Sequence, residues 1–132
     1  MNLLIDTHCL IWAALEPKKL SARVRGLLID PANTVQVSSI SFWEISLKYA
    51  LGKLELTGCT PEDLVQAADS MQFVWCLPTA EECASFHRLP RVAHKDPFDR
   101  MLVWQCIQRG MTLLTKDSAM TEYVPLGLRS IW

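Results

Sequence analysis

Near its N-terminus the chain reads Asn2-Leu3-Leu4-Ile5-Asp6-Thr7-His8, and this stretch largely decides the fold. The short apolar run before the acid is typical of a strand that is buried on both faces of a sheet. A helix is expected soon after the acid. A strand followed closely by a helix predicts a crossover unit, so Asp6 should lie at the carboxyl edge of a parallel sheet.

Apolar runs rich in branched residues recur along the chain and alternate with helical patterns, each of which opens on a capping side chain. Parallel neighbours need crossover connections, and the crossovers cover the sheet. The alternation therefore predicts an α/β fold, with a parallel sheet of about five strands and helices on both of its faces. The candidate strands are residues 2–5, 35–38, 73–77, 112–115 and 128–131.

Length and composition limit the class of protein. The chain has 132 residues without a repeat or a linker, so residues 1–132 are expected to form one domain. No apolar run could span a membrane and no secretory leader is recognisable. Five scattered cysteines favour a reducing cytoplasm over a disulfide framework. With 13 Lys and Arg against 14 Asp and Glu, any contact with nucleic acid must be local.

Four acids are expected to meet at one edge of this sheet. Asp6 and Asp117 follow candidate strands, while Glu44 and Asp99 are placed in the first turns of helices that begin at the same edge. Carboxylates that lie within a few ångströms of one another repel, and a divalent cation relieves the repulsion. Oxygen ligands suit magnesium, and also manganese, and such an ion can activate water against a phosphodiester.

Structural roles compete with this interpretation for some of the acids. The spacing of Ser41 and Glu44 also fits a capping box, in which Glu44 would only bind a backbone amide. Asp99 has the same alternative explanation. An acid directly after a buried strand has no comparable structural task, so Asp6 and Asp117 favour the metal site.

Four stretches that contain these acids resemble the signature blocks of the PIN domain family, in order and in spacing. They are Leu4-Ile5-Asp6-Thr7-His8, Ser41-Phe42-Trp43-Glu44-Ile45, His94-Lys95-Asp96-Pro97-Phe98-Asp99-Arg100 and Leu114-Thr115-Lys116-Asp117. The third block points to the branch of VapC-type toxins. The resemblance implies an α/β/α sandwich and a magnesium-dependent endoribonuclease in which Asp6, Glu44 and Asp99 bind the ion, with Asp117 as a more variable fourth acid. It also implies a homodimer, and a type II pair in which a small antitoxin protein inhibits the toxin.

Other polar residues are expected to support the acids. Asp96 is best explained as the N-cap of the helix that starts at Pro97, rather than as a primary ligand. Thr7 and Thr115 could orient water or phosphate, or bond the local backbone. Basic residues near the acids could hold the RNA backbone, or could form a solvated loop. The candidate RNA contacts are His94, Lys95, Arg100 and Lys116.

Five tryptophans are many for this length. Trp43, Trp75 and Trp104 lie in apolar helical or strand patterns and are expected in the core. Trp12 lies on a helix that begins near the acids, where an aromatic side chain could belong either to the core or to a partner interface.

Two alternatives to a toxin nuclease stay open. One is a catalytically silent PIN-like module that binds RNA or a partner, and the other is a PIN nuclease of RNA processing without an antitoxin. A haloacid-dehalogenase-like phosphatase is disfavoured, because its second Asp would stand at the position of His8.

Overall fold

The computed structural model describes residues 1–132. Strands and helices alternate along the chain. No helix combines the length and the apolar character that crossing a membrane requires. In chain order the elements are β1 (Asn2–Ile5), α1 (Thr7–Leu15), η1 (Pro17–Lys19), α2 (Ala22–Ile29), β2 (Thr34–Ser38), α3 (Ser39–Ala50), α4 (Pro61–Ser70), β3 (Val74–Cys76), α5 (Ala80–Ser85), η2 (Phe86–Arg88), α6 (Pro97–Arg109), β4 (Thr112–Leu114), η3 (Ser118–Leu126) and β5 (Arg129–Ile131).

All five strands are parallel and form one sheet in the order β3-β2-β1-β4-β5. Ile5 of β1 pairs with Val37 of β2 and with Leu114 of β4, so these strands finish at the same edge. The predicted α/β class and parallel sheet are confirmed. The candidate strands differ from the observed ones by at most one residue at either end.

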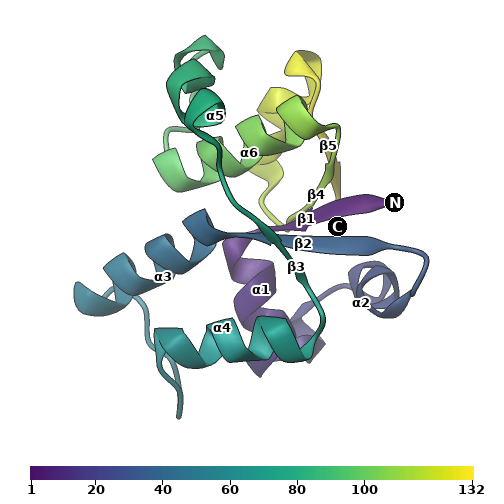
Figure 1. Ribbon diagram of the computed structural model, residues 1–132, viewed down its shortest axis with the longest axis vertical. Coiled ribbons are helices and arrows are strands. Elements are labelled where there is room, and N and C mark those ends of the chain that lie inside the picture. Colours follow the sequence, from purple (N-terminus) through teal and green to yellow (C-terminus); the bar gives the residue numbers. More distant parts are fainter.

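Helices cover both faces of the sheet, with α1 to α4 on one face and α5 and α6 on the other (Figure 1). Residues of β1 alternate between two hydrophobic cores. Leu3 and Ile5 pack with side chains of α1, α3 and α4, whereas Leu4 packs with side chains of α6. All three are completely buried, which explains why β1 is uninterruptedly apolar in sequence. The three-layer α/β/α arrangement is therefore confirmed.

Capping side chains open the helices, as the sequence patterns predict, although α3 begins earlier than expected. Thr60 with Asp63, and Thr79 with Glu82, form reciprocal capping boxes at the starts of α4 and α5. Gly110 ends α6 with φ at 65°, a left-handed conformation that glycine adopts without a steric penalty. These local signals position the helices before any tertiary contact is considered.

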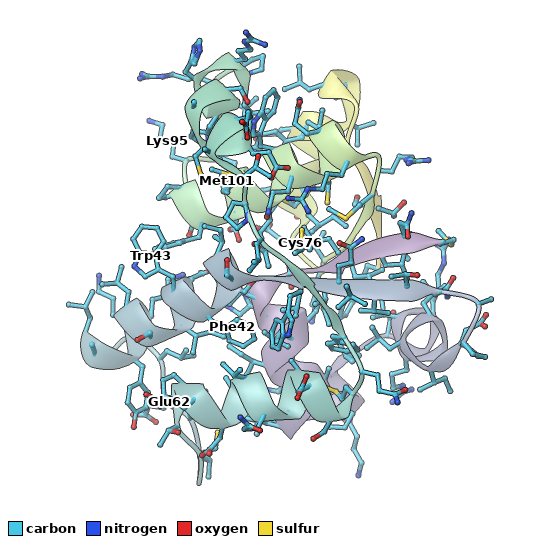
Figure 2. The ribbon with its side chains drawn as sticks, viewed as in Figure 1. Phe42, Trp43, Glu62, Cys76, Lys95 and Met101 are labelled. Carbon is cyan, nitrogen blue, oxygen red and sulfur yellow. The ribbon has the colours of Figure 1, made fainter.

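The expectation for two tryptophans is wrong. Trp43 is 62% exposed and Trp75 is 41% exposed, whereas Trp104 is buried as expected. Trp43 projects from the outward side of α3 toward the start of α6, where its ring meets Phe98 edge to face at 5.2 Å between centroids (Figure 2). Trp75 belongs to β3, an edge strand of three residues that neighbouring elements cover incompletely.

This difference predicts unequal stability losses. Trp104→Ala is expected to lower the free energy of unfolding by about 3–5 kcal/mol, because it leaves a cavity in the core. It also removes the indole N–H donor to the carbonyl of Glu82. Trp43→Ala should cost less than about 1 kcal/mol. Urea denaturation of the two variants measures the contrast, and equal losses would contradict the burial difference.

Candidate active site

The acids lie where the topology of the sheet reverses. The chain runs from β1 outward to β2 and β3, and then returns to β4 on the other side of β1. Open parallel sheets bind ligands at such switch points, outside the carboxyl ends of the strands. Asp6 directly follows β1, and Asp117 follows β4 after Thr115 and Lys116. Both acids therefore occupy the edge that the sequence predicted.

Glu44 and Asp99 reach the same edge from two helices that pack against each other, α3 and α6. Asp99 lies in the first turn of α6, as predicted. The prediction for Glu44 is wrong in detail, because α3 begins at Ser39 with Ser38 as its N-cap. Glu44 consequently lies in the second turn, and the alternative capping box with Ser41 does not form.

Two groups of side chains bring one donor atom each to within 4.8 Å of one another. One group is Glu44, Asp96 and Asp99, and the other is His94, Asp99 and Asp117. Asp99 belongs to both groups and is the centre of the cluster. Asp6 lies outside both groups but borders them, since its negative charge contributes to the raised pKa of Asp99.

Asp6 is held in a buried position by several hydrogen bonds. Its side chain is the N-cap of α1, and Oδ1 accepts from the backbone N–H of Cys9 at 2.8 Å. Burial raises the pKa of Asp6 above its ordinary value, against the opposing effect of hydrogen bonds from Thr115 and Cys9. The Thr115 hydroxyl also accepts from the backbone N–H of Asp117, so it links the two strand-end acids.

The surroundings of Asp99 disfavour its ionised form. Burial and, after it, the negative charges of the other acids together raise its pKa from 3.8 to about 7. Those acids are Asp96, Glu44, Asp6 and Asp117. At neutral pH a group with this pKa holds a proton for much of the time, and a nearby cation would favour its ionised form.

Thr7 and Lys48 fix the position of Glu44. The Thr7 hydroxyl donates to Oε1 of Glu44 at 2.7 Å, and its oxygen lies 3.0 Å from the Ser41 hydroxyl, from which it can accept. The Lys48 ammonium pairs with Oε2 of Glu44 and lies 3.7 Å from Oδ2 of Asp96. Asp96 is the N-cap of α6, and its Oδ1 accepts from the backbone N–H groups of Phe98 and Asp99.

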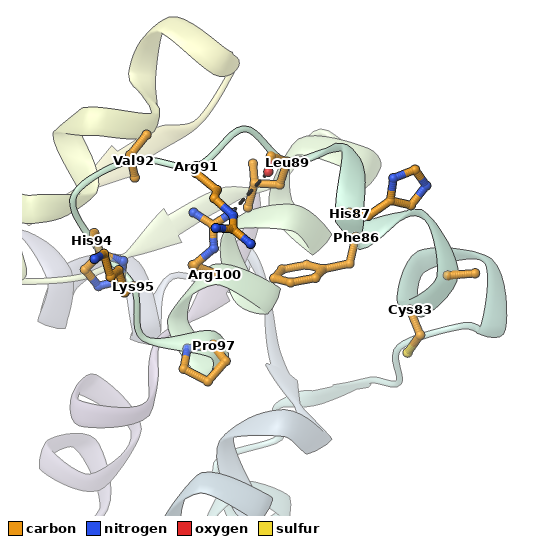
Figure 3. Close-up of a pocket in the computed structure, with 11 residues that line it drawn as sticks. Cys83, Phe86, His87, Leu89, Arg91, Val92, His94, Lys95, Pro97 and Arg100 are labelled. Atoms are coloured by element: carbon orange, nitrogen blue, oxygen red, sulfur yellow. Dashed lines mark hydrogen bonds between the residues drawn. The ribbon is translucent and has the colours of Figure 1, made fainter.

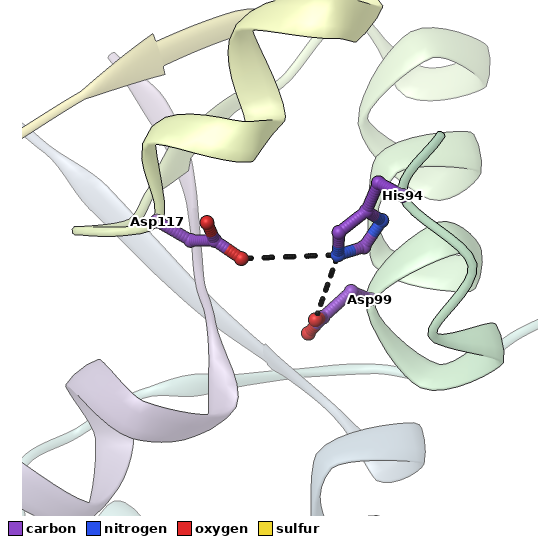
Figure 4. Close-up of side chains that lie close together, drawn as sticks. All are labelled: His94, Asp99 and Asp117. Carbon is purple, nitrogen blue, oxygen red and sulfur yellow. Dashed lines mark ion pairs between the residues drawn. The ribbon is translucent and has the colours of Figure 1, made fainter. Parts of the chain in front are cut away.

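His94 lies between two of the acids (Figure 4). Its Nε2 is 3.3 Å from Oδ2 of Asp99 and 3.7 Å from Oδ2 of Asp117. Its Nδ1 hydrogen-bonds the Tyr123 hydroxyl at 2.9 Å, which fixes the orientation of the ring. His94 is therefore part of the acid cluster, rather than only a basic residue beside it.

The donors at this edge suit a hard divalent cation. Carboxylate oxygens are the ligands that magnesium and manganese prefer. The negative charge is balanced within the cluster only by Lys48, and by His94 when it is protonated. Burial, together with the negative charges of the neighbouring acids, accounts for the raised pKa of Asp99. The carboxylates concerned are those of Asp6, Glu44, Asp96, Asp99 and Asp117.

Residues 3–124 match the family model of the PIN domain. The chain belongs to the PIN domain family. The matched range includes all four acids that were predicted as ligands, and it confirms the resemblance of the four sequence blocks.

Individual relatives of this PIN domain carry the names VapC or VapBC. The chain is 27% identical over 122 residues to Ribonuclease VapC22 of Mycobacterium tuberculosis, covering 92% of each protein. Its fold is similar to that in VapBC2 from Rickettsia felis bound to a promoter DNA fragment, with a TM-score of 0.67, 17% identity, and 100% and 99% of the two chains covered. VapBC-1 from nontypeable Haemophilus influenzae gives a TM-score of 0.64 at 16% identity, covering 99% and 97%.

One predicted RNA contact does not fit its position in this PIN domain. Arg100 is only 9% exposed, and its guanidinium donates to the Tyr123 hydroxyl and to the carbonyl oxygens of Leu89 and Pro90. The same group lies over the ring of Phe86, 5.6 Å from its centroid. Because these contacts occupy its donors, Arg100 holds the loop before α6 instead of facing solvent.

The two lysines of the predicted RNA-contacting set are exposed. Lys95 lies in the loop before α6 and forms no ion pair within 4.0 Å. Lys116 places its ammonium 5.8 Å from the ring centroids of both Trp12 and Trp132. Trp12 is partly buried against the core and meets Trp132 edge to face.

Sequence reasoning missed Tyr123 entirely. Its hydroxyl contacts His94 and Arg100, and the side chain is completely buried. No local signal connects residues that lie 29 positions apart, since Tyr123 falls in the irregular segment η3. That Tyr123 is buried beside His94 could be predicted only from the fold.

Proposed function

We propose that this PIN domain is a magnesium-dependent endoribonuclease that hydrolyses phosphodiester bonds of RNA. The observation that carries the proposal is the concentration of uncompensated carboxylates around Asp99 at the switch point of the sheet. A purely structural role is a weak explanation, because buried like charges raise one another's pKa and destabilise the fold. Such arrangements are typical of functional sites. The name of the relative in Mycobacterium tuberculosis supports the same class of reaction.

In the proposed reaction Asp6, Glu44, Asp99 and Asp117 hold the cation, either directly or through water. A divalent ion bound there supplies charge neutralisation at the phosphate and acidifies water for the attack. Thr7 and Lys48 keep Glu44 oriented, and Thr115 keeps Asp6 and Asp117 in register. His94 can hold a proton at Nε2 between Asp99 and Asp117.

The direct test is cleavage of labelled single-stranded and structured RNA by the purified protein with Mg²⁺, with Mn²⁺, and with EDTA. The proposal expects cleavage with either ion and none after chelation. Magnesium-dependent RNA binding without cleavage of any substrate would contradict a nuclease and support a silent binding module. Cleavage that persists in EDTA would contradict the metal mechanism.

We further propose that the protein acts in the cytoplasm as the toxin of a type II toxin–antitoxin pair and forms a homodimer. The structural neighbours are named as VapBC complexes, one of them bound to promoter DNA. Large apolar side chains on α3 and at its C-cap are available for such contacts, since Trp43, Leu47 and Leu51 are all more than 40% exposed. Multi-angle light scattering should give twice the chain mass for a homodimer.

The antitoxin proposal has a separate test. A short reading frame beside this gene should encode a small protein that co-purifies with the chain and blocks its RNA cleavage. If the chain cuts RNA while no encoded neighbour binds it, a role in RNA processing without an antitoxin is favoured instead.

Thr7 is expected to affect activity through its hydrogen bond to Glu44, without contacting the ion itself. Thr7→Val keeps the side-chain shape but removes the donor to Oε1 of Glu44, so Glu44 loses its fixed orientation. We expect RNA cleavage to fall about 10–100-fold, which is typical when a hydrogen-bond partner of a metal ligand is removed. Thr7→Ser retains the hydroxyl and serves as the matched control. Wild-type turnover in Thr7→Val would contradict the positioning role.

A further inference from the structure

A cavity of about 670 Å³ opens beside the acid cluster, in front of the loop that leads into α6 (Figure 3). Its walls come from α5, η2, the loop and the first turn of α6. This volume is in the range of small-molecule and nucleotide sites. Phe86, Leu89 and Val92 provide apolar wall, whereas Arg91 and Lys95 provide charge.

The cavity is cationic although the whole chain has a formal net charge of −1. Five of the eleven lining residues are Arg, Lys or His and none is Asp or Glu. Arg91 and Lys95 are exposed and form no ion pair within 4.0 Å, so their charges are available to a ligand. The cavity therefore suits an anion.

The cavity is also preformed, because contacts within the protein hold its walls in place. The buried guanidinium of Arg100 binds the carbonyl oxygens of Leu89 and Pro90 and stacks on Phe86 and Tyr123. These contacts fix the loop that carries Arg91 and Lys95 before any ligand arrives. A preformed site loses less conformational entropy on binding.

Two residues connect the cavity to the acid cluster. His94 lines the cavity, and its Nε2 lies 3.3 Å from Asp99. Pro97 lines it as well, two positions before Asp99 on α6. A polyanion with one anionic group at the acid cluster could therefore place the next anionic group in the cavity.

We propose that this cavity is an RNA subsite, in which Arg91 and Lys95 bind the phosphate next to the bond that is cut, while the Phe86 wall accepts the attached nucleotide. The inference rests on the proposed ribonuclease function and adds a substrate-binding site to it. RNA is favoured over an acidic protein segment because the cavity combines the exposed cations Arg91 and Lys95 with the aromatic Phe86, which suits a phosphate that carries a base.

The test measures RNA affinity at several salt concentrations in the Asp6→Asn background with Mg²⁺, so that binding is observed without turnover. Arg91→Gln and Lys95→Gln should each weaken the binding of a short single-stranded RNA and reduce the slope of log K against log salt by about 0.7. Lys18→Gln on η1, an exposed lysine between α1 and α2, is the matched control and should match the background.

The same substitutions in the active protein should raise KM and leave kcat nearly unchanged. Unaltered RNA affinity and KM in both variants would overturn the subsite, even if the protein cuts RNA. RNA that binds without being cut would overturn the nuclease, while salt slopes reduced by Arg91→Gln and Lys95→Gln would still support the subsite. Loss of antitoxin binding with unchanged RNA affinity would assign the cavity to a protein segment and overturn the proposal.

Discussion

Asp6→Asn is expected to lower RNA cleavage by more than about 100-fold, since losing a partner behind a metal ligand already costs about 10–100-fold. Stability should not fall with activity. Asn is as good an N-cap as Asp, so the hydrogen bond from the Cys9 N–H to the side-chain oxygen can persist. The substitution also removes a carboxylate whose pKa is raised by burial, and therefore a charge that disfavours the fold.

The matched control is Asp30→Asn. Asp30 is an exposed carboxylate whose Oδ1 accepts from the Ala32 N–H, and Asn can keep that hydrogen bond as well. Cleavage rates in Mg²⁺ and urea denaturation of both variants separate the two effects. Wild-type cleavage by Asp6→Asn would contradict the mechanism, and inactivity accompanied by unfolding would show that the residue acts through the fold.

The metal-free protein is expected to lose stability as the pH rises from 5 to 7. Burial, with the neighbouring acids, raises the pKa of Asp99 from 3.8 to about 7. In this window the folded state holds a proton that the unfolded state has released. Each unit of pH increase therefore lowers the free energy of unfolding by up to about 1.4 kcal/mol. The raised pKa of Asp6 changes the stability in the same direction. The pKa of Glu82 is lowered by Arg109, and that contribution is lost only at lower pH.

Asp99→Asn should remove most of this slope and make the metal-free protein more stable than wild type at pH 7. Urea denaturation in EDTA at pH 5, 6 and 7 measures both effects, and Asp30→Asn again serves as the control with an unchanged slope. Magnesium should stabilise the wild type most at pH 7, where ligand carboxylates are ionised, and release protons on binding. A wild-type slope equal to that of Asp99→Asn would contradict the electrostatic cluster.

The charges behind this prediction also explain the relation of the site to the fold. Asp99 lies at the N-terminus of α6, where the helix dipole favours an anion, and Lys48 offsets part of the charge on Glu44 and Asp96. The pKa of Asp99 nevertheless stays raised, because burial and the charges of the neighbouring acids outweigh these compensations. Catalytic sites commonly retain such unfavourable arrangements, and the hydrophobic cores on both sides of the sheet supply the stability that tolerates them.

The sheet, most helix ends and the edge at which the acids lie could all be predicted from the sequence. The apolar run Leu3-Leu4-Ile5 predicts a strand because both of its faces must be buried, and Thr60 and Thr79 mark helix starts because a cap involves only the next turn. Asp6 and Asp117 could be placed because every strand of a parallel sheet ends at one edge. These features depend on residues close in sequence or on a general rule of topology.

The sequence did not predict which polar groups meet within that edge, because this depends on the packing of the folded chain. His94 lies between Asp99 and Asp117 because buried Tyr123, 29 residues away, fixes its ring, and Arg100 is withdrawn from solvent by the loop that it binds. Trp43 is exposed because α3 presents other residues to the core. Such outcomes depend on the mutual packing of helices and loops, whose contacts are set by distances in space and leave no periodic or capping pattern in the local sequence.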